Sequence, residues 1–155
     1  MELKQGQRVA EEVVKTLAPH CSRIEVAGSI RREKPVVKDI DLVVIPNDPW
    51  RLTNELIKLG QVKMSGKKLV RVMLGLRQLD VYFADEETWA TVLLIRTGSV
   101  ENNIRLCSLA KKRGWRLAAS GDGLFNEKGE RIAGDTEQSI YEALSLPYQE
   151  PRERW

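Results

Sequence analysis

The spacing of hydrophobic residues changes several times along the chain, and each change predicts a new helix or strand. Val9, Val13 and Leu17 recur every four residues before Pro19, the pattern of one helix face followed by a helix stop. Helices are expected over residues 5–18, 50–59, 85–96, 99–113 and 136–144. Short apolar runs between turn residues predict strands at residues 23–27, 40–46, 61–65, 68–74 and 77–83.

The order of these elements predicts an α+β protein with two lobes. Residues 40–46 are apolar almost throughout, so this strand should lie in the interior of a sheet. Thr97-Gly98 interrupts the later helices. We therefore expect a mixed β-sheet flanked by helices over residues 1–94 and a smaller α+β lobe over residues 95–155, with short strands and turns in its middle.

The bulk composition is that of an ordinary globular protein and changes this picture little. The 155 residues are 42% hydrophobic and 30% charged, and the net charge of +3 does not by itself argue for nucleic acid. Cys21 and Cys107 are expected to be reduced, because two cysteines suggest neither a disulfide framework nor a zinc site. No signal peptide or long apolar run is recognised, which predicts a soluble cytoplasmic protein without a membrane partner.

Acidic residues inside apolar strands are the strongest indication of chemistry. Asp39 and Asp41 are two residues apart, so their side chains should project from the same face of the strand. Like charges this close are unfavourable unless a cation lies between them, and carboxylate pairs suit magnesium. Asp80 is again an acid inside an apolar strand, and we favour it as a third ligand over a strand-end acid that faces solvent.

A possible anion-binding turn precedes the acid pair. Gly28-Ser29 follows an apolar strand, and Arg31, Arg32 and Lys34 come directly after it. Such a turn offers backbone N–H groups and a hydroxyl to a phosphate. Beside a metal-holding acid pair, this arrangement indicates nucleotide chemistry.

Two sets of residues resemble a known family. Gly28-Ser29, then Asp39-Ile40-Asp41 after nine residues, then Asp80 resemble the motif of the nucleotidyltransferase superfamily. The second lobe is similar to the family X DNA polymerases, the relatives of polymerase β. The residues that carry this second similarity are Thr97-Gly98-Ser99, Asn103, Leu146-Pro147-Tyr148, Glu150-Pro151 and Glu153-Arg154.

The resemblance covers nearly the whole chain and implies an architecture. The first lobe would be a nucleotidyltransferase palm, and the second would close on the nucleotide, as the lobe called fingers or thumb does. Larger members carry a further N-terminal domain that grips gapped DNA. We expect this chain to correspond to the compact form, which has only the palm and the C-terminal lobe.

The family reaction, attack of a primer 3′-hydroxyl on a nucleoside triphosphate, implies a role for each matching residue. Asp39 and Asp41 would bind two magnesium ions, with manganese as an alternative, and Asp80 would bind the catalytic ion beside the primer hydroxyl. Ser29 and Arg32 would hold the triphosphate, Gly98-Ser99 would surround the sugar with a cis peptide, and Asn103 would contact the base. The residues expected to bind the nucleotide are thus Gly28, Ser29, Arg32, Gly98, Ser99 and Asn103.

DNA would be gripped by basic residues, through salt-dependent contacts with phosphates. The candidates are Lys63, Lys67, Lys68, Arg71, Arg105, Lys111, Lys112 and the neighbouring Arg113. Two positions depart from the family pattern. Ile95-Arg96 stands where an aromatic residue is usual, and Cys107 stands where some members have a base-checking arginine. We expect weaker exclusion of ribonucleotides, low fidelity and distributive binding.

The function expected from the sequence is template-directed DNA synthesis in the repair of short gaps. The partners would be primer-template or gapped DNA, nucleoside triphosphates and a DNA ligase acting afterwards, and the protein would be a monomer. A template-independent terminal nucleotidyltransferase is the first alternative. A non-catalytic module that binds DNA ends is the second, although such a module has no physical reason to keep three mutually repelling acids.

Overall fold

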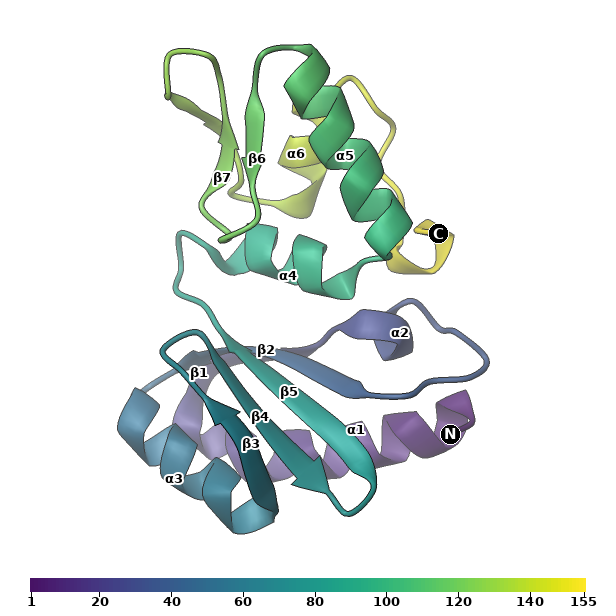
Figure 1. Ribbon diagram of the computed structural model, residues 1–155, viewed down its shortest axis with the longest axis vertical. Coiled ribbons are helices and arrows are strands. Elements are labelled where there is room, and N and C mark those ends of the chain that lie inside the picture. Colours follow the sequence, from purple (N-terminus) through teal and green to yellow (C-terminus); the bar gives the residue numbers. More distant parts are fainter.

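Two lobes lie on either side of one helix in the computed structural model, which describes residues 1–155 (Figure 1). The first lobe has helices α1 (Leu3–Leu17), α2 (Gly28–Arg31) and α3 (Pro49–Leu59). Its strands are β1 (Cys21–Val26), β2 (Ile40–Pro46), β3 (Gln61–Ser65), β4 (Leu69–Leu74) and β5 (Arg77–Phe83). The second lobe contains α5 (Val100–Lys112), β6 (Arg116–Ala118), β7 (Gly123–Phe125), β8 (Arg131–Ala133) and α6 (Glu137–Ala143). Helix α4 (Trp89–Thr97) lies between them, so the division expected at residues 94 and 95 falls inside a helix.

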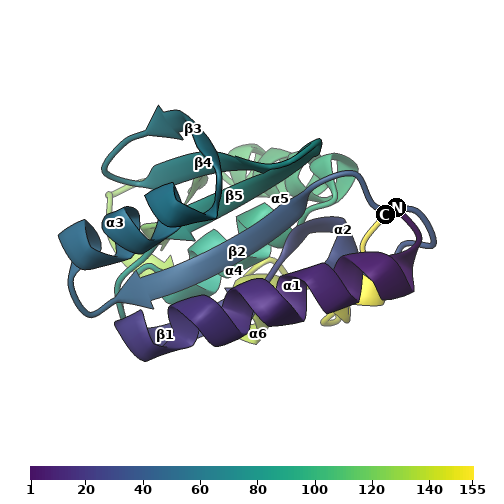
Figure 2. The ribbon, with the colours of Figure 1, turned by 90° about the horizontal axis from the view of Figure 1, so that it is seen from below.

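The first lobe is built on a five-stranded mixed sheet in the order β1-β2-β5-β4-β3. Strands β2 and β5 are parallel, and the other neighbours are antiparallel. Helices α1 and α3 cover one face of this sheet (Figure 2). Their apolar residues join Leu42, Val44, Leu79 and Val81 in the main core, while α4 packs on the opposite face against Val43. Both faces of β2 are therefore covered, which explains its continuous apolar sequence.

The second lobe packs a three-stranded antiparallel sheet, β6-β7-β8, against α5 and α6. Leu94 of α4 belongs to this core, whereas Trp89, Val92 and Leu93 belong to the core on the five-stranded sheet. Helix α4 thus contributes apolar side chains to both lobes. None of the helices is long and apolar enough to cross a membrane.

The structure confirms most of the expected elements and their caps. The Ser99 hydroxyl accepts a hydrogen bond from the Asn102 amide at 3.1 Å, and the Thr136 hydroxyl accepts one from Ser139 at 3.0 Å. The predicted start of α4 at Asp85 is early, because the Asp85 carboxylate caps a separate turn by accepting from the amides of Glu87 and Thr88. The helix itself begins at Trp89.

Candidate active site

A cavity of about 660 Å³ lies between the two lobes and gathers most of the predicted site residues. The palm supplies Gly28, Ser29, Arg32, Asp39 and Asp41 to its lining, and the other side supplies Gly98 and Asn103. Ile95 and Arg96, which depart from the family pattern, line it too. Asp80 and Ser99 are buried and do not line this cavity.

The acids come together through the register of three strands. Asp41 of β2 is paired with Asp80 of β5, and Asp80 is paired in turn with Arg71 of β4. Along their strands, Asp41 and Asp80 alternate with Leu42, Leu79 and Val81, whose side chains point into the main core. The two acids therefore lie on the other face of the sheet, which is the face toward the second lobe. The strand β2 has the predicted bounds of 40–46, so Asp39 lies just before it and is exposed, and only Asp41 projects from the strand itself.

Asp80 is held by side chains from its own and the neighbouring strand. Arg71 donates to it from Nε at 2.8 Å and from Nη2 at 3.2 Å. Gln78 Nε2 donates to Oδ2 at 3.2 Å, and the Tyr82 hydroxyl lies 3.4 Å from the same oxygen. Burial and the charges of Asp41 and Asp80 raise the pKa of Tyr82 to about 12, so this hydroxyl keeps its proton at neutral pH. Asp80 is 4% exposed, which excludes the alternative of a solvent-facing acid.

Asp41 differs from Asp80 because no cation is bonded to it. Burial, reinforced by the charges of Asp80 and Asp39, raises the pKa of Asp41 to about 7, and the charges of Arg32 and Arg96 oppose this rise. A carboxyl with this pKa is destabilised in its charged form by its neighbours. A bound cation would relieve that repulsion.

The donor set therefore suits a hard cation such as magnesium, although the three acids do not converge on one point. In this structure, no group of three acidic, histidine or cysteine side chains is close enough to hold a metal together. Both oxygens of Asp80 are bonded to Arg71. Metal binding by Asp39, Asp41 and Asp80 therefore stays a prediction.

Gly28 is required by the way Asp41 packs. It has a φ of +62°, and a Cβ at this position would lie 2.2 Å from Oδ2 of Asp41. The amide of Ala27 donates to the backbone oxygen of Asp41 at 2.8 Å, which fixes the distance between the turn and β2. The Gly28-Ser29 turn and Asp41 are thus in direct contact, as a phosphate site beside a cation site would need to be.

Arg32 connects the palm to the turn that follows α4. Its Nη1 donates to the backbone oxygen of Thr97 and would lie 2.9 Å from a Cβ placed on Gly98. Its Nε is buried without a partner, and burial lowers the pKa of Arg32. The peptide bond between Gly98 and Ser99 is cis, as the family resemblance predicts.

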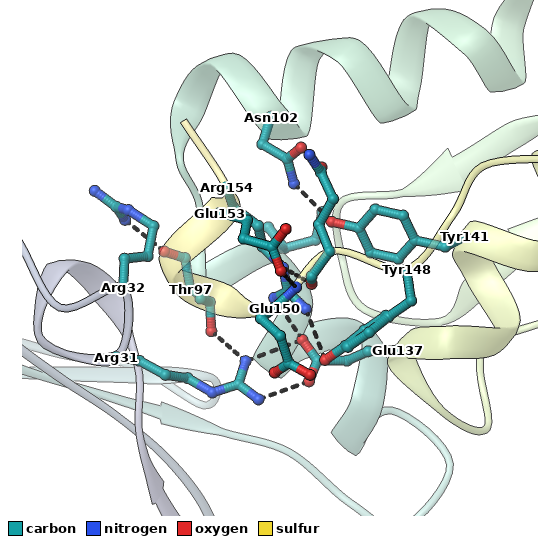
Figure 3. A network of polar contacts seen from close by, with 12 residues as sticks. Arg31, Arg32, Thr97, Asn102, Glu137, Tyr141, Tyr148, Glu150, Glu153 and Arg154 are labelled. Atoms are coloured by element: carbon teal, nitrogen blue, oxygen red, sulfur yellow. Dashed lines mark hydrogen bonds and ion pairs between the residues drawn. The ribbon is translucent and has the colours of Figure 1, made fainter.

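A buried ion cluster joins the lobes beside this turn (Figure 3). Arg31 of the palm donates to both carboxylate oxygens of Glu137, at 2.7 and 2.9 Å, and to the Thr97 hydroxyl at 2.9 Å. Arg154 is fully buried and donates to Glu137 at 2.7 Å and to the Tyr148 hydroxyl at 3.1 Å. Burial would raise the pKa of Glu137, but the two arginines outweigh it and hold the pKa below its usual value. The tail motif at Tyr148 and Arg154 is therefore part of the contact between lobes.

Asn103 of α5 and Arg96 of α4 also line the cavity. The Asn103 amide donates to the backbone oxygen of Ile95 at 2.8 Å, and its Oδ1 is buried without a partner. The Arg96 guanidinium lies 4.3 Å from the centre of the Tyr82 ring. Arg96 thus connects the second lobe to a residue that contacts Asp80.

The predicted DNA-binding residues fall into two groups. Lys63, Lys67 and Lys68 are exposed around the β3–β4 turn, and Lys111, Lys112 and Arg113 are exposed at the end of α5. Arg71, Arg105 and Arg113 have partners within the protein, and Arg113 donates to the backbone oxygens of Ala143 and Leu144 at 2.8 and 3.0 Å. Arg71 is bonded to Asp80, and Arg105 donates to Asn102 and Gln149. Contact with DNA stays a prediction for all of these residues.

Sequence reasoning missed the contact between Arg71 and Asp80, but the sequence contains an indication of it. Gly75-Leu76 forms a two-residue turn between β4 and β5, with Leu74 paired to Arg77. Counting outward from such a turn places Arg71 opposite Asp80. The Glu137 cluster has no comparable local indication, because its members are far apart in the chain.

Comparison with known proteins supports the fold. Residues 92–155 match the family model described as DNA polymerase beta thumb. The chain is 31% identical over 155 residues to DNA polymerase/3′-5′ exonuclease PolX of Bacillus subtilis, which aligns with 95% of this chain. It is 28% identical over 142 residues to Repair DNA polymerase X of African swine fever virus, covering 84% of this chain and 80% of the viral protein.

The fold is also that of a solved relative. A crystal structure of Leishmania infantum polymerase beta, described as a ternary P/T complex, superimposes with a TM-score of 0.81 at 19% identity. That match covers all of this chain and 76% of the solved one. The chain spans only 27% of the length of the Bacillus protein.

Together, the mixed sheet of the first lobe and the second lobe that matches the thumb model define a polymerase β-like fold. The matches to the Bacillus PolX and to the viral Repair DNA polymerase X support a relationship with family X of the DNA polymerases.

Proposed function

We propose that this chain adds nucleotides to a primer 3′-hydroxyl by two-metal nucleotidyl transfer, directed by a DNA template. The observation that carries the proposal is the pairing of Asp41 with Asp80 on the sheet face toward the second lobe, next to the turn at Gly28. Two acids and an anion-binding turn in contact are what phosphoryl chemistry requires.

The palm residues would bind the cations and the primer end. Asp39 and Asp41 would hold two magnesium ions, and Asp80 would join them at the catalytic position. Bound magnesium would neutralise the charge that develops on the attacking and leaving oxygens. Asp80 is also the best candidate to accept the proton of the primer hydroxyl.

The nucleotide would lie in the cavity between the lobes. Ser29 and Arg32 would donate to the triphosphate, which favours negative charge moving toward the leaving group. Arg32 already bonds to Thr97, so nucleotide binding there would be coupled to the position of the second lobe. Gly98-Ser99 would lie beside the sugar, and Asn103 would contact the base from the minor groove, where readout is degenerate.

DNA would be held mainly by its phosphates, which points to weak and distributive synthesis over short gaps. Exposed lysines around Lys67 and Lys112 offer sequence-independent contacts. Affinity and extension should therefore fall steadily as salt rises. Such synthesis suits repair, with a DNA ligase acting on the product.

Single-nucleotide extension tests this proposal. The chain should be assayed on templated, gapped and single-stranded primers with magnesium or manganese. We expect extension on templated and gapped DNA, and a loss of at least about 100-fold for Asp80→Ala. Glu86→Ala, in an exposed turn, is the matched control and should retain activity. Equal extension of single strands would instead indicate template-independent transfer. Extension that survives Asp80→Ala would refute the assigned catalytic role.

A further inference from the structure

One basic residue of this chain contacts a predicted catalytic carboxylate directly. Arg71 forms a two-point ion pair with Asp80, and the arginine side chain remains 32% exposed while that of Asp80 is 5% exposed. The other basic residues near the β3–β4 turn, such as Lys68, form no ion pair. Arg71 is therefore set apart from its neighbours by its contact with the candidate site.

The ion pair leaves the two neighbouring acids in different states. Both oxygens of Asp80 accept hydrogen bonds from Arg71, and Oδ2 is also contacted by Gln78 and Tyr82. Asp41, opposite Asp80 in the register, has no ion pair. A cation that enters this site would find Asp41 without a partner and Asp80 already neutralised.

We propose that Arg71 is an internal counter-ion that competes with the catalytic cation for Asp80. The inference rests on the proposed function. The guanidinium must release at least one oxygen of Asp80 before a cation can bind there, and its partial exposure gives it space to move outward. Arg71 is thus a positioning residue. It keeps Asp80 in place while no cation is bound, and it lowers the affinity of the site for a cation because both compete for the same carboxylate.

A purely structural role is the competing explanation. An arginine that only ties β4 to β5 would affect stability and leave metal affinity unchanged. However, the backbone register already joins the two strands over six residue pairs, so the sheet does not depend on this contact. The two explanations differ in metal affinity, which can be measured without DNA or nucleotide.

The experiment is a titration of the full chain with manganese, following free Mn²⁺ by electron paramagnetic resonance. Arg71→Gln should bind Mn²⁺ about tenfold more tightly than the wild type, which corresponds to about 1.4 kcal/mol. Lys68→Gln removes the same charge next to β4 without touching Asp80 and should change the affinity by less than about twofold, as expected for screened surface charges. Adding Asp80→Asn to Arg71→Gln should abolish the gain in Mn²⁺ affinity, because the carboxylate that the cation would bind is then absent.

Arg71→Lys keeps the charge but loses the two-point contact, so it should bind Mn²⁺ about threefold more tightly. This variant preserves the test if Arg71→Gln folds poorly, which thermal unfolding would reveal. Unchanged or weaker Mn²⁺ affinity in the folded variant would overturn the inference. Primer extension by the wild type should be measured in parallel. If the wild type extends primers while the variant binds Mn²⁺ no more tightly, the inference about Arg71 fails and the proposed function stands.

Discussion

Arg31 and Glu137 form a two-point ion pair across the lobes, and Arg154 binds the same carboxylate from a fully buried position. One carboxylate thus binds two arginines from distant parts of the chain and offsets one of their two positive charges. Removing it would leave buried positive charge uncompensated, which is far more costly than losing a surface ion pair. The position of the second lobe on the palm therefore depends on Glu137.

Glu137→Gln should lower the free energy of unfolding by about 3–5 kcal/mol, because Arg154 would stay buried without a counter-charge. Denaturant unfolding at neutral pH measures this change. Glu142→Gln, on the exposed face of the same helix, is the control and should have little effect. Folding lowers the pKa of Glu137 from its unfolded value of about 4.5. The charged carboxylate therefore stabilises the fold above pH 4.5, and this stabilisation is lost as the pH falls through the lower pKa of the folded state. Equal stability of the two variants would contradict this account.

Asp41→Asn should stabilise the protein at neutral and higher pH. The pKa of Asp41 is raised from 3.8 to about 7, so the folded state binds a proton that the unfolded state has released, and wild-type stability falls as the pH rises between these values. The variant lacks this penalty. Its advantage should grow from pH 4 to pH 7 and then level off at about 2–4 kcal/mol.

Thermal unfolding between pH 4 and pH 9, without divalent cations, measures the difference. Glu86→Gln is the control, because this exposed residue lies in a turn away from the acid row. A stability gain at pH 4 as large as that at pH 8 would show that Asp41 is not the titrating group. A loss of stability at pH 8 would show that the charged carboxylate has a favourable partner.

The strands of the site could be predicted from the sequence, but the neighbours of the acids could not. Alternation and turn residues locate β2 and β5, and the apolar surroundings of Asp80 mark it as unusual. Whether Asp80 lies opposite Asp41 depends on the register of a parallel pair, which no local pattern fixes. The sequence predicts Arg71 only as a DNA contact, and its bond to Asp80 comes from the register of β4 on β5.

The contact between lobes was also beyond local sequence patterns. Glu137 lies in a short amphipathic helix and resembles any first-turn acid, and Arg154 lies in an irregular tail. Only tertiary packing buries them together. The family resemblance pointed to the tail residues without giving their role.

Gly28→Ala should impair the site more than the fold. Its φ of +62° disfavours a side chain, and the added Cβ would push the Asp41 carboxylate away from its position. We expect a loss of about 1–3 kcal/mol in stability and at least about tenfold in primer extension. Gly114→Ala has a similar φ of +74° but no atom within 4 Å of its Cβ. It should lose about 1–2 kcal/mol of stability and no activity per folded molecule. Equal activity of the two variants would show that the contact between Gly28 and Asp41 is unimportant.

Ile95→Tyr should increase discrimination against ribonucleotides. Ile95 lines the cavity beside Gly98, where the sugar is expected, and leaves space that an aromatic ring would fill. A ring there would exclude an added 2′-hydroxyl by steric contact, whereas the smaller side chain tolerates it. We expect the wild type to prefer deoxynucleotides by less than about 100-fold and the variant to raise that ratio about tenfold or more, because a steric clash is worth a few kcal/mol. The ratio of kcat/KM for matched deoxy- and ribonucleotides measures this discrimination.

Ile104→Tyr, on the exposed face of α5, is the control and should leave the ratio unchanged. A wild-type preference of many thousandfold would mean that another residue selects the sugar.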